Sequence, residues 1–309
     1  MPHSWEQTIK IDVELAHELI RDQFNLSIRT ITLLDEGWDN AVYLVNDDLI
    51  FRFPRRKFGL SCMENEILLL PYLSQHVTFP CSAPKWIGHP SANYPYPFEG
   101  YPFLPGKSLC DATLSLIDNK TFAETLALWL KELHSVSVRS SDLQLLKGDH
   151  DWRLNVAHRV QRCHQNLDQY GHFFIEAGFK KEHLLKVIDK LNHFKIAENK
   201  KTYVHGDLYH RHVLVDSDIL LPTGIIDWGD IHIGEPGIDL AVGMIFMRTA
   251  FEEFLKAYGT LDHNTMMILQ LHAFAHAMSF LPYAYEQGRK HLKIWACLQL
   301  NRAAEEINC

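Results

Sequence analysis

A short strand-rich segment, residues 203–227, interrupts the helical second half of this 309-residue chain. Two apolar stretches within it, 213–215 and 224–226, flank an Asp-Ser-Asp turn, and this pattern predicts a β-hairpin. A Gly-Asp turn that ends at Asp207 precedes the first strand, and Asp227 follows the second. The fold must therefore place a hairpin that carries two carboxylates within a largely helical region.

The register of this hairpin determines which side chains meet at its open end. If Val215 pairs with Gly224, the residue before the first strand falls opposite the residue after the second. These two residues are His212 and Asp227, an imidazole and a carboxylate. Phosphoryl transfer needs a divalent cation that screens the triphosphate and a carboxylate that accepts the hydroxyl proton. His212 and Asp227 are the candidates for the metal, and Asp207 is the candidate for the substrate alcohol.

The N-terminal part of the chain is rich in strand signals. Five short extended segments are predicted there, at residues 28–34, 41–45, 49–53, 85–88 and 100–103. An amphipathic helix at 8–27 precedes them, and a helix at 62–73 lies between the third and the fourth. From residue 108 onward, apolar residues recur mainly at helical spacing, most clearly over 122–134.

These patterns predict an α+β fold in two lobes. Residues 1–104 form a small antiparallel β lobe, and residues 105–309 form a larger helical lobe with the embedded hairpin. A cleft between the two lobes is expected to hold the site.

Composition excludes several classes of protein. The formal net charge is −8 and no run of lysine and arginine occurs, so a nucleic-acid partner is not expected. No apolar stretch approaches the roughly 20 residues that cross a bilayer, and residues 1–7 do not resemble a signal peptide. Six cysteines without a CxxC pair predict free thiols in a reducing compartment. We expect a cytoplasmic protein without a membrane partner; a monomer is expected, although the sequence leaves the oligomeric state open.

Two motifs resemble those of a known enzyme family. HGDLYHRH, residues 205–212, resembles the catalytic HGDxxxxN motif of the aminoglycoside phosphotransferase family, a branch of the protein-kinase-like fold. IDWGD, residues 226–230, is similar to the metal motif of that family. His212 stands at the position of the family asparagine, as in the 2″-aminoglycoside and macrolide 2′-phosphotransferases. The phrases HVLVD, TGIIDWGD and EPGIDLA also resemble those two groups, and the motifs keep the family order from about residue 30 to 245.

This resemblance implies a reaction and roles for the motif residues. The implied fold is the two-lobed protein-kinase-like fold. The implied reaction moves the γ-phosphate of GTP or ATP, with Mg²⁺, to a hydroxyl of a small molecule such as an aminoglycoside or a macrolide. Asp207 is the implied catalytic carboxylate, and Asp227 with His212 is the implied metal site. Asp239, in EPGIDLA, is expected to open a helix or to brace the catalytic loop by hydrogen bonds.

The resemblance also assigns the nucleotide phosphates to the N-terminal lobe. The turn at 35–40 resembles the nucleotide-positioning loop of the family. Arg52, in FRFPR, stands where kinases carry the lysine that holds the phosphates, and its charged fork of donors suits this role. Glu66, from the following helix, is the implied partner of Arg52, and Glu64 is the alternative.

The segment GYPFLPGKSL resembles the linker between lobes that binds the purine. By this match, Pro102 offers its carbonyl and Leu104 its amide to the purine edge. Tyr101 then occupies the gatekeeper position, and a bulky aromatic residue there resembles the enzymes that use GTP, so GTP is favoured slightly over ATP.

The acceptor remains open at this stage. Carboxylates that would suit an aminoglycoside are Glu252, Glu253 and Glu286; apolar residues that would suit a macrolide are Met244, Phe246, Phe274 and Met278. A kinase of a housekeeping metabolite or amino sugar is the alternative within the enzyme class. A pseudokinase-like nucleotide-binding module is the alternative outside it. The 19 histidines contain no HExxH motif, which disfavours a metal hydrolase.

Overall fold

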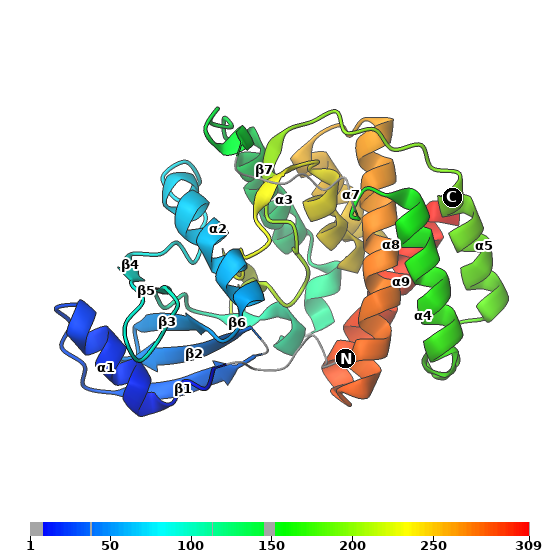
Figure 1. Cartoon of the computed structure of the whole chain (residues 1–309). Helices are drawn as coiled ribbons and strands as arrows, with labels where there is room; N and C mark the ends of the chain where they lie inside the picture. The colour runs from blue at the N-terminus through cyan, green and yellow to red at the C-terminus, as the bar shows by residue number, and fades with distance from the viewer. Residues whose placement is uncertain (1–8, 38, 113, 145–151, 309) are drawn as a thin grey trace. The chain divides into compact units, whose positions relative to one another are not determined.

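An antiparallel sheet of five strands organises the N-terminal part of the chain, in the computed structural model shown in Figure 1. Its strands are β1 (Ile31–Glu36), β2 (Asn40–Val45), β3 (Leu49–Pro54), β4 (Trp86–Gly88) and β5 (Phe98–Pro102), in the order β1-β2-β3-β5-β4. Helix α1 (Val13–Gln23) precedes the sheet, and α2 (Lys57–Leu73) lies between β3 and β4 in the sequence. The predicted β lobe is confirmed.

The structure describes residues 9–37, 39–112, 114–144 and 152–308. The N-terminal residues 1–8, Trp38 of the predicted nucleotide-positioning turn, and Cys309 therefore lie outside the described residues. Among the described cysteines, none forms a disulfide. No helix in this part of the chain is both long and apolar enough to span a membrane.

Local sequence signals set the ends of these elements. Asn46 and Asp47 adopt φ of 54° and 64° in the tight turn between β2 and β3, a conformation that asparagine and aspartate tolerate. The Asn46 side chain also accepts hydrogen bonds from the backbone N–H of Arg29 and Thr30. Asp12 caps α1 by accepting from the backbone N–H of Leu15 at 2.9 Å, so the helix begins later than predicted.

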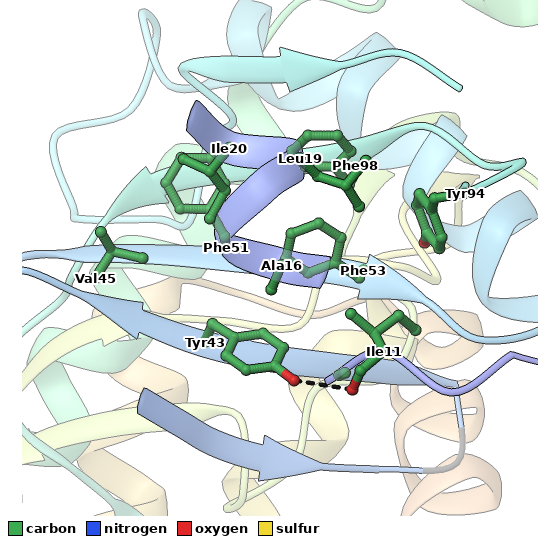
Figure 2. Close-up of a cluster of buried hydrophobic side chains, with 11 residues drawn as sticks. Ile11, Ala16, Leu19, Ile20, Tyr43, Val45, Phe51, Phe53, Tyr94 and Phe98 are labelled. Carbon is green, nitrogen blue, oxygen red and sulfur yellow. Dashed lines mark hydrogen bonds between the residues drawn. The ribbon is translucent and has the colours of Figure 1, made fainter. Parts of the chain in front are cut away.

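One face of α1 covers an aromatic core, shown in Figure 2. The helix contributes the buried Ala16, Leu19 and Ile20. The rings of Phe53 and Phe98, on β3 and β5, stack at 4.7 Å between centroids. Such aromatic pairs bury large apolar areas and contribute beyond that burial, so β3 and β5 are packed against a layer of aromatic side chains.

Helices dominate the rest of the chain. They are α3 (Lys120–Ser135), α4 (Val156–Glu176), α5 (Lys181–Asn192), α6 (Gly237–Leu240), α7 (Arg248–Tyr258), α8 (His263–Glu286) and α9 (Lys290–Asn308). Helix α3 packs on α7, and α8 packs on both α4 and α9. Side-chain caps from Asn119, Asn155 and Asp262 start α3, α4 and α8.

Short strands are embedded among these helices, as the hairpin pattern predicted. They are β6 (Lys107–Ser108), β7 (Thr202–Val204), β8 (Val213–Asp216), β9 (Leu221–Ile225) and β10 (His232–Gly234). Strands β6, β8 and β9 form one sheet, and β7 pairs antiparallel with β10.

The chain divides into two units, each of which contains two separate stretches of the sequence. Unit 1 contains Met1–Pro105 and Gly224–Ile231, and unit 2 contains Gly106–Thr223 and His232–Cys309. The segment after the hairpin, with Asp227, therefore belongs to the same unit as the five-stranded sheet. Asp207 and His212 belong to the helical unit.

Candidate active-site residues

The loop after β7 is pinned by one buried carboxylate. Asp239, on α6, accepts hydrogen bonds from the backbone N–H of His205 at 2.7 Å and of Gly206 at 3.0 Å. Nε2 of His134 lies 3.1 Å from the same carboxylate. Burial alone would raise the pKa of Asp239, but the hydrogen bond from His134 and the nearby imidazoles outweigh it and lower that pKa. The predicted brace of the loop is confirmed.

Asp207 and His212 lie close together in the loop 205–212, which is named the catalytic loop after the predicted role of Asp207. Gly206 has a φ of 85°, which turns the chain so that Asp207 leaves the core. The side chain of Asp207 is 42% exposed. His212 is buried, and its Nδ1 lies 2.8 Å from the backbone carbonyl of Asp207. Because a carbonyl only accepts, Nδ1 donates this hydrogen bond, so a neutral His212 ring would have its lone pair on Nε2.

The middle of the catalytic loop is anchored in the helical core. The centroid of the Tyr209 ring lies 4.4 Å from that of His212 and 4.9 Å from that of His276 on α8. His210 is fully buried and stacks on Trp295 of α9 with an interplanar angle of 15°. Burial and neighbouring imidazoles lower the pKa of His210 well below its ordinary value, so this ring is neutral. The stacking of His210 on Trp295 therefore anchors the loop to α9.

In unit 1, Arg52 on β3 is surrounded by carboxyl groups. Its Nη1 donates to both oxygens of Glu66 at 2.8 Å and to Oε1 of Glu99 at 3.2 Å. Its Nη2 donates to Oδ1 of Asp227 at 3.4 Å. The predicted pairing with Glu66 is confirmed, since Glu64 on the same helix is exposed. We call Arg52, Glu66, Glu99 and Asp227 the Arg52 cluster.

The Arg52 cluster holds more acid than base. Glu66 and Glu99 are both fully buried, and burial raises the pKa of Glu66 to about 7. Burial, together with the charge of Glu66, raises the pKa of Glu99 well above its ordinary value. Burial opposes the charge of Arg52, but the carboxylates around it hold its pKa high, so the guanidinium stays charged.

Asp227 is presented by a turn that its neighbours fix. Its φ is 63°, in the left-handed region, and its side chain is 52% exposed. Trp228 donates from its indole to the carbonyl of Ile225 at 2.9 Å, which closes the turn. A Cβ at Gly229 would lie 2.8 Å from Cβ of Cys62, so only glycine allows this approach to α2. The IDWGD motif is thus a fixed support for one accessible carboxylate.

Comparison with known proteins decides the family. The model of the phosphotransferase enzyme family matches residues 30–273 of the chain. The chain belongs to this family. The predicted family and enzyme class are therefore confirmed.

Solved structures similar to this phosphotransferase share its fold. The GDP complex of aminoglycoside 2′-phosphotransferase-IIIa is 20% identical, with a TM-score of 0.67 over 94% of this chain and 98% of that one. A macrolide 2′-phosphotransferase from Brachybacterium faecium, solved without ligand, is 20% identical, with a TM-score of 0.60 over 92% and 98%. The ADP-bound aminoglycoside phosphotransferase APH(2″)-Ib is 17% identical, with a TM-score of 0.58 over 96% and 99%. The fold class predicted from the sequence is confirmed.

The linker residues predicted in this phosphotransferase lie at the end of β5. Tyr101 is buried and pairs with Ile50, and Pro102 ends the strand opposite Leu49. Within the described residues, the backbone N–H of Leu104 takes part in no hydrogen bond. An available amide at Leu104 suits a purine contact, and that contact stays a prediction.

The predicted ligands of magnesium, Asp227 and His212, belong to different units of this phosphotransferase. Asp227 offers an accessible carboxylate oxygen, a hard ligand of the kind that magnesium prefers. Magnesium usually takes only one or two protein groups, with phosphates and water completing its octahedron. Within the described ranges, no group of three or more His, Cys, Asp or Glu side chains could hold a metal ion. The metal role of Asp227 and His212 stays a prediction.

One member of the Arg52 cluster was not predicted. Glu99 lies directly opposite Arg52 in the pairing of β3 with β5. The predicted strand began only at residue 100, because tyrosine and proline residues before it resemble a loop. The signal in the sequence was the charged residue Glu99 directly between the apolar Phe98 and the predicted strand, which could have indicated that the strand begins earlier.

The structure places the residues that were considered for the two acceptor alternatives. The apolar residues considered for a macrolide wall are all buried in the core: Met244, Phe246, Phe274 and Met278. As placed, they do not line an open surface. Glu252 and Glu253 are surface residues of α7 that pair with Arg248 and Lys256 along the helix.

A cavity of about 330 Å³ lies between α4 and α8, within unit 2. Its described lining residues are Trp152, His158, Arg159, Arg162, Ala275 and Ser279, none of which is acidic. Arg159 is buried, and its Nη2 lies 3.3 Å from Nδ1 of His272. The chain of contacts continues through His276 to Tyr209 of the catalytic loop. Basic side chains of this cavity are therefore connected to that loop through two intervening histidines.

Proposed function

We propose that this phosphotransferase transfers the γ-phosphate of GTP or ATP to a hydroxyl group of a small molecule, with aminoglycoside and macrolide antibiotics as the first acceptors to test. The observation that carries the proposal is the Arg52 cluster. Residues 52, 66 and 227 are far apart in the sequence, yet one guanidinium contacts both carboxylates. An arginine held by a helix glutamate beside an accessible aspartate suits a metal-bound triphosphate.

In the proposed mechanism, each unit supplies one part of the chemistry. Arg52 binds the phosphates of the donor; Asp227 of unit 1 and His212 of unit 2 are the residues that would hold Mg²⁺. The metal, when bound, screens the charge of the triphosphate. Asp207 accepts a hydrogen bond from the acceptor hydroxyl and takes its proton as the phosphate is transferred. The brace from Asp239 keeps the Asp207 backbone fixed during this step.

Tyr101, Pro102 and Leu104 are the proposed purine contacts. Pro102 accepts from the purine edge through its carbonyl, and Leu104 donates through its amide. Tyr101 limits the depth of the pocket and favours GTP. Similar solved structures contain GDP or ADP, so both donors belong in the test.

The acceptor class rests on similarity. One similar structure contains GDP and kanamycin, and others are macrolide 2′-phosphotransferases. A metabolite or amino-sugar kinase is the second candidate, because the cavity between α4 and α8 is lined by Arg159 and Arg162, whereas a cationic antibiotic would favour carboxylates. We place the enzyme in the cytoplasm, in keeping with the free cysteines of the described part, and we propose that it is a monomer.

A transfer assay with γ-labelled GTP and ATP against panels of aminoglycosides, macrolides and uncharged or anionic sugars tests the proposal. Labelled antibiotic is the expected product. Labelled sugar without labelled antibiotic would favour the metabolite kinase, and nucleotide binding without any transfer would favour a pseudokinase. Asp207→Ala should abolish transfer and largely preserve nucleotide binding, whereas Asp227→Ala should weaken binding of the metal–nucleotide complex as well. Full turnover by Asp207→Ala would contradict the mechanism.

A further inference from the structure

Glu99 is a buried acid that has no role in the proposed mechanism. Its side chain has no exposed surface and lies on β5, between the aromatic core and α2. Oε1 accepts from Nη1 of Arg52 at 3.2 Å. Oε2 is buried and has no hydrogen-bond partner among the described residues. An ionised carboxylate would leave this oxygen unsolvated, which costs free energy.

The geometry of the Arg52–Glu66 pair leaves room for a second anchor. Both oxygens of Glu66 contact the same nitrogen, Nη1, so the pair is not the two-nitrogen fork that fixes a guanidinium plane. A contact through one nitrogen leaves the plane free to swing about that point. Glu99 contacts Nη1 from a strand, and Glu66 contacts it from a helix. The two directions together fix Nη1.

The other nitrogen, Nη2, faces the accessible side of the cluster. Its contact with Oδ1 of Asp227 is long, at 3.4 Å, and that carboxylate is half-exposed. Nη2 can therefore exchange Asp227 for a phosphate oxygen while Nη1 keeps its contacts. A long contact to an exposed partner is the weaker of the two sides.

Charge determines which form of Glu99 suits this task. A fully ionised cluster would contain three carboxylates against one guanidinium, beside the place proposed for a triphosphate. Burial, with Glu66 nearby, raises the pKa of Glu99 well above its ordinary value. In a neutral Glu99, Oε2 would carry the proton, and Oε1 would still accept from Nη1 of Arg52. A neutral Glu99 thus adds a contact without adding repulsion toward the phosphates.

We propose that Glu99 is a positioning residue: as a neutral acid it holds Nη1 of Arg52 so that Nη2 is directed to the phosphates of the donor nucleotide. This inference rests on the proposed nucleotide-binding role of Arg52. Glu99 acts only through Arg52 and touches no reacting group.

Two variants separate the contact from the charge. Glu99→Gln keeps the shape and the accepting oxygen without the acid, and Glu99→Leu removes the contact. Glu64→Gln and Glu64→Leu, at the exposed position on α2, are the matched controls. The readout is the dissociation constant of GTP with Mg²⁺, by calorimetric titration, beside that of guanosine, which lacks phosphates. Thermal unfolding of each variant checks that it is folded.

We expect Glu99→Leu to weaken GTP binding about 10-fold, the equivalent of one hydrogen bond to a charged group. Guanosine binding should stay unchanged, and Glu99→Gln should stay within about twofold of the natural protein. If Glu99→Leu does not fold, Glu99→Asp, which draws the oxygen back by one methylene, should show the same selective loss for GTP.

Three results would overturn the inference. They are unchanged GTP binding in the variants that remove the contact, an equal loss for guanosine, and a Glu99→Gln variant as weak as Glu99→Leu. Failure of the proposed function gives a different pattern, in which Arg52→Gln leaves GTP binding unchanged. A loss in Arg52→Gln without a loss in Glu99→Leu would retain the proposed function and reject the role of Glu99.

Discussion

The brace beneath the catalytic loop can be tested by Asp239→Asn, which changes one oxygen of the side chain into an NH₂ group. Oδ1 accepts from the backbone N–H of Gly206, and Oδ2 accepts from that of His205 and contacts His134. Because donors surround both positions, the new NH₂ must face an N–H in either orientation. Breaking a buried charged network of this kind costs about 3–5 kcal/mol of the free energy of unfolding. For a chain of this size, the midpoint of thermal unfolding should fall on the order of 10 °C.

The assay combines thermal unfolding with hydrogen exchange at the amides of His205 and Gly206. Both amides should exchange faster in Asp239→Asn, and phosphate transfer should fall with them, because Asp207 follows directly. Asp168→Asn, a surface aspartate of α4 that contacts Lys181, is the matched control and should change neither quantity. If Asp239→Asn exchanges at the rate of the natural protein and loses less than about 1 kcal/mol, the brace does not bear on the loop.

Three further outcomes follow from other parts of the molecule. Burial lowers the pKa of His276 to about 4 in the folded protein, compared with about 6.5 in the unfolded chain. The unfolded chain therefore binds a proton more readily at this residue. The resulting contribution to the free energy of unfolding is fully present above pH 6.5 and is lost as the pH falls from about 6.5 toward 4. His276→Phe should reduce this loss in unfolding measured across that range, and an unchanged pH dependence would assign the loss to other groups. Gly229→Ala should cost about 1–3 kcal/mol by denaturant titration, since the added Cβ meets Cys62 at 2.8 Å; no loss would mean that α2 moves aside. Tyr101→Leu should raise the ratio of ATP to GTP turnover, and a constant ratio would remove Tyr101 from donor choice.

Residues whose neighbours are close in the sequence were predictable. The hairpin of β8 and β9, the strand that carries Arg52 and the helix that carries Glu66 follow from local periodicity and turn chemistry. The choice of Glu66 over Glu64 also follows from one helix, because only one of the two faces the sheet. The brace by Asp239 was expected in outline, although its two backbone partners become visible only in the structure.

Residues that act through pairing across the fold were not predictable. Glu99 meets Arg52 through the register of β3 with β5, which joins segments separated by a helix and another strand. A local pattern contains no such register. The sequence also could not show whether Met244 and Phe274 line a pocket. Helical periodicity indicates that a side chain is buried, but it does not indicate which cavity, if any, the side chain lines.

The division of unit 1 into two stretches of sequence has a consequence for synthesis. A growing chain releases Met1–Pro105 well before Gly224–Ile231, so the unit of the five-stranded sheet stays incomplete until most of the polypeptide exists. During that interval, Arg52 and Glu66 are made but Asp227 is not. Formation of the Arg52 cluster therefore waits on a late, long-range closure, and such closures are slow steps. A fragment that ends at residue 105 would consequently lack the one accessible carboxylate of the Arg52 cluster.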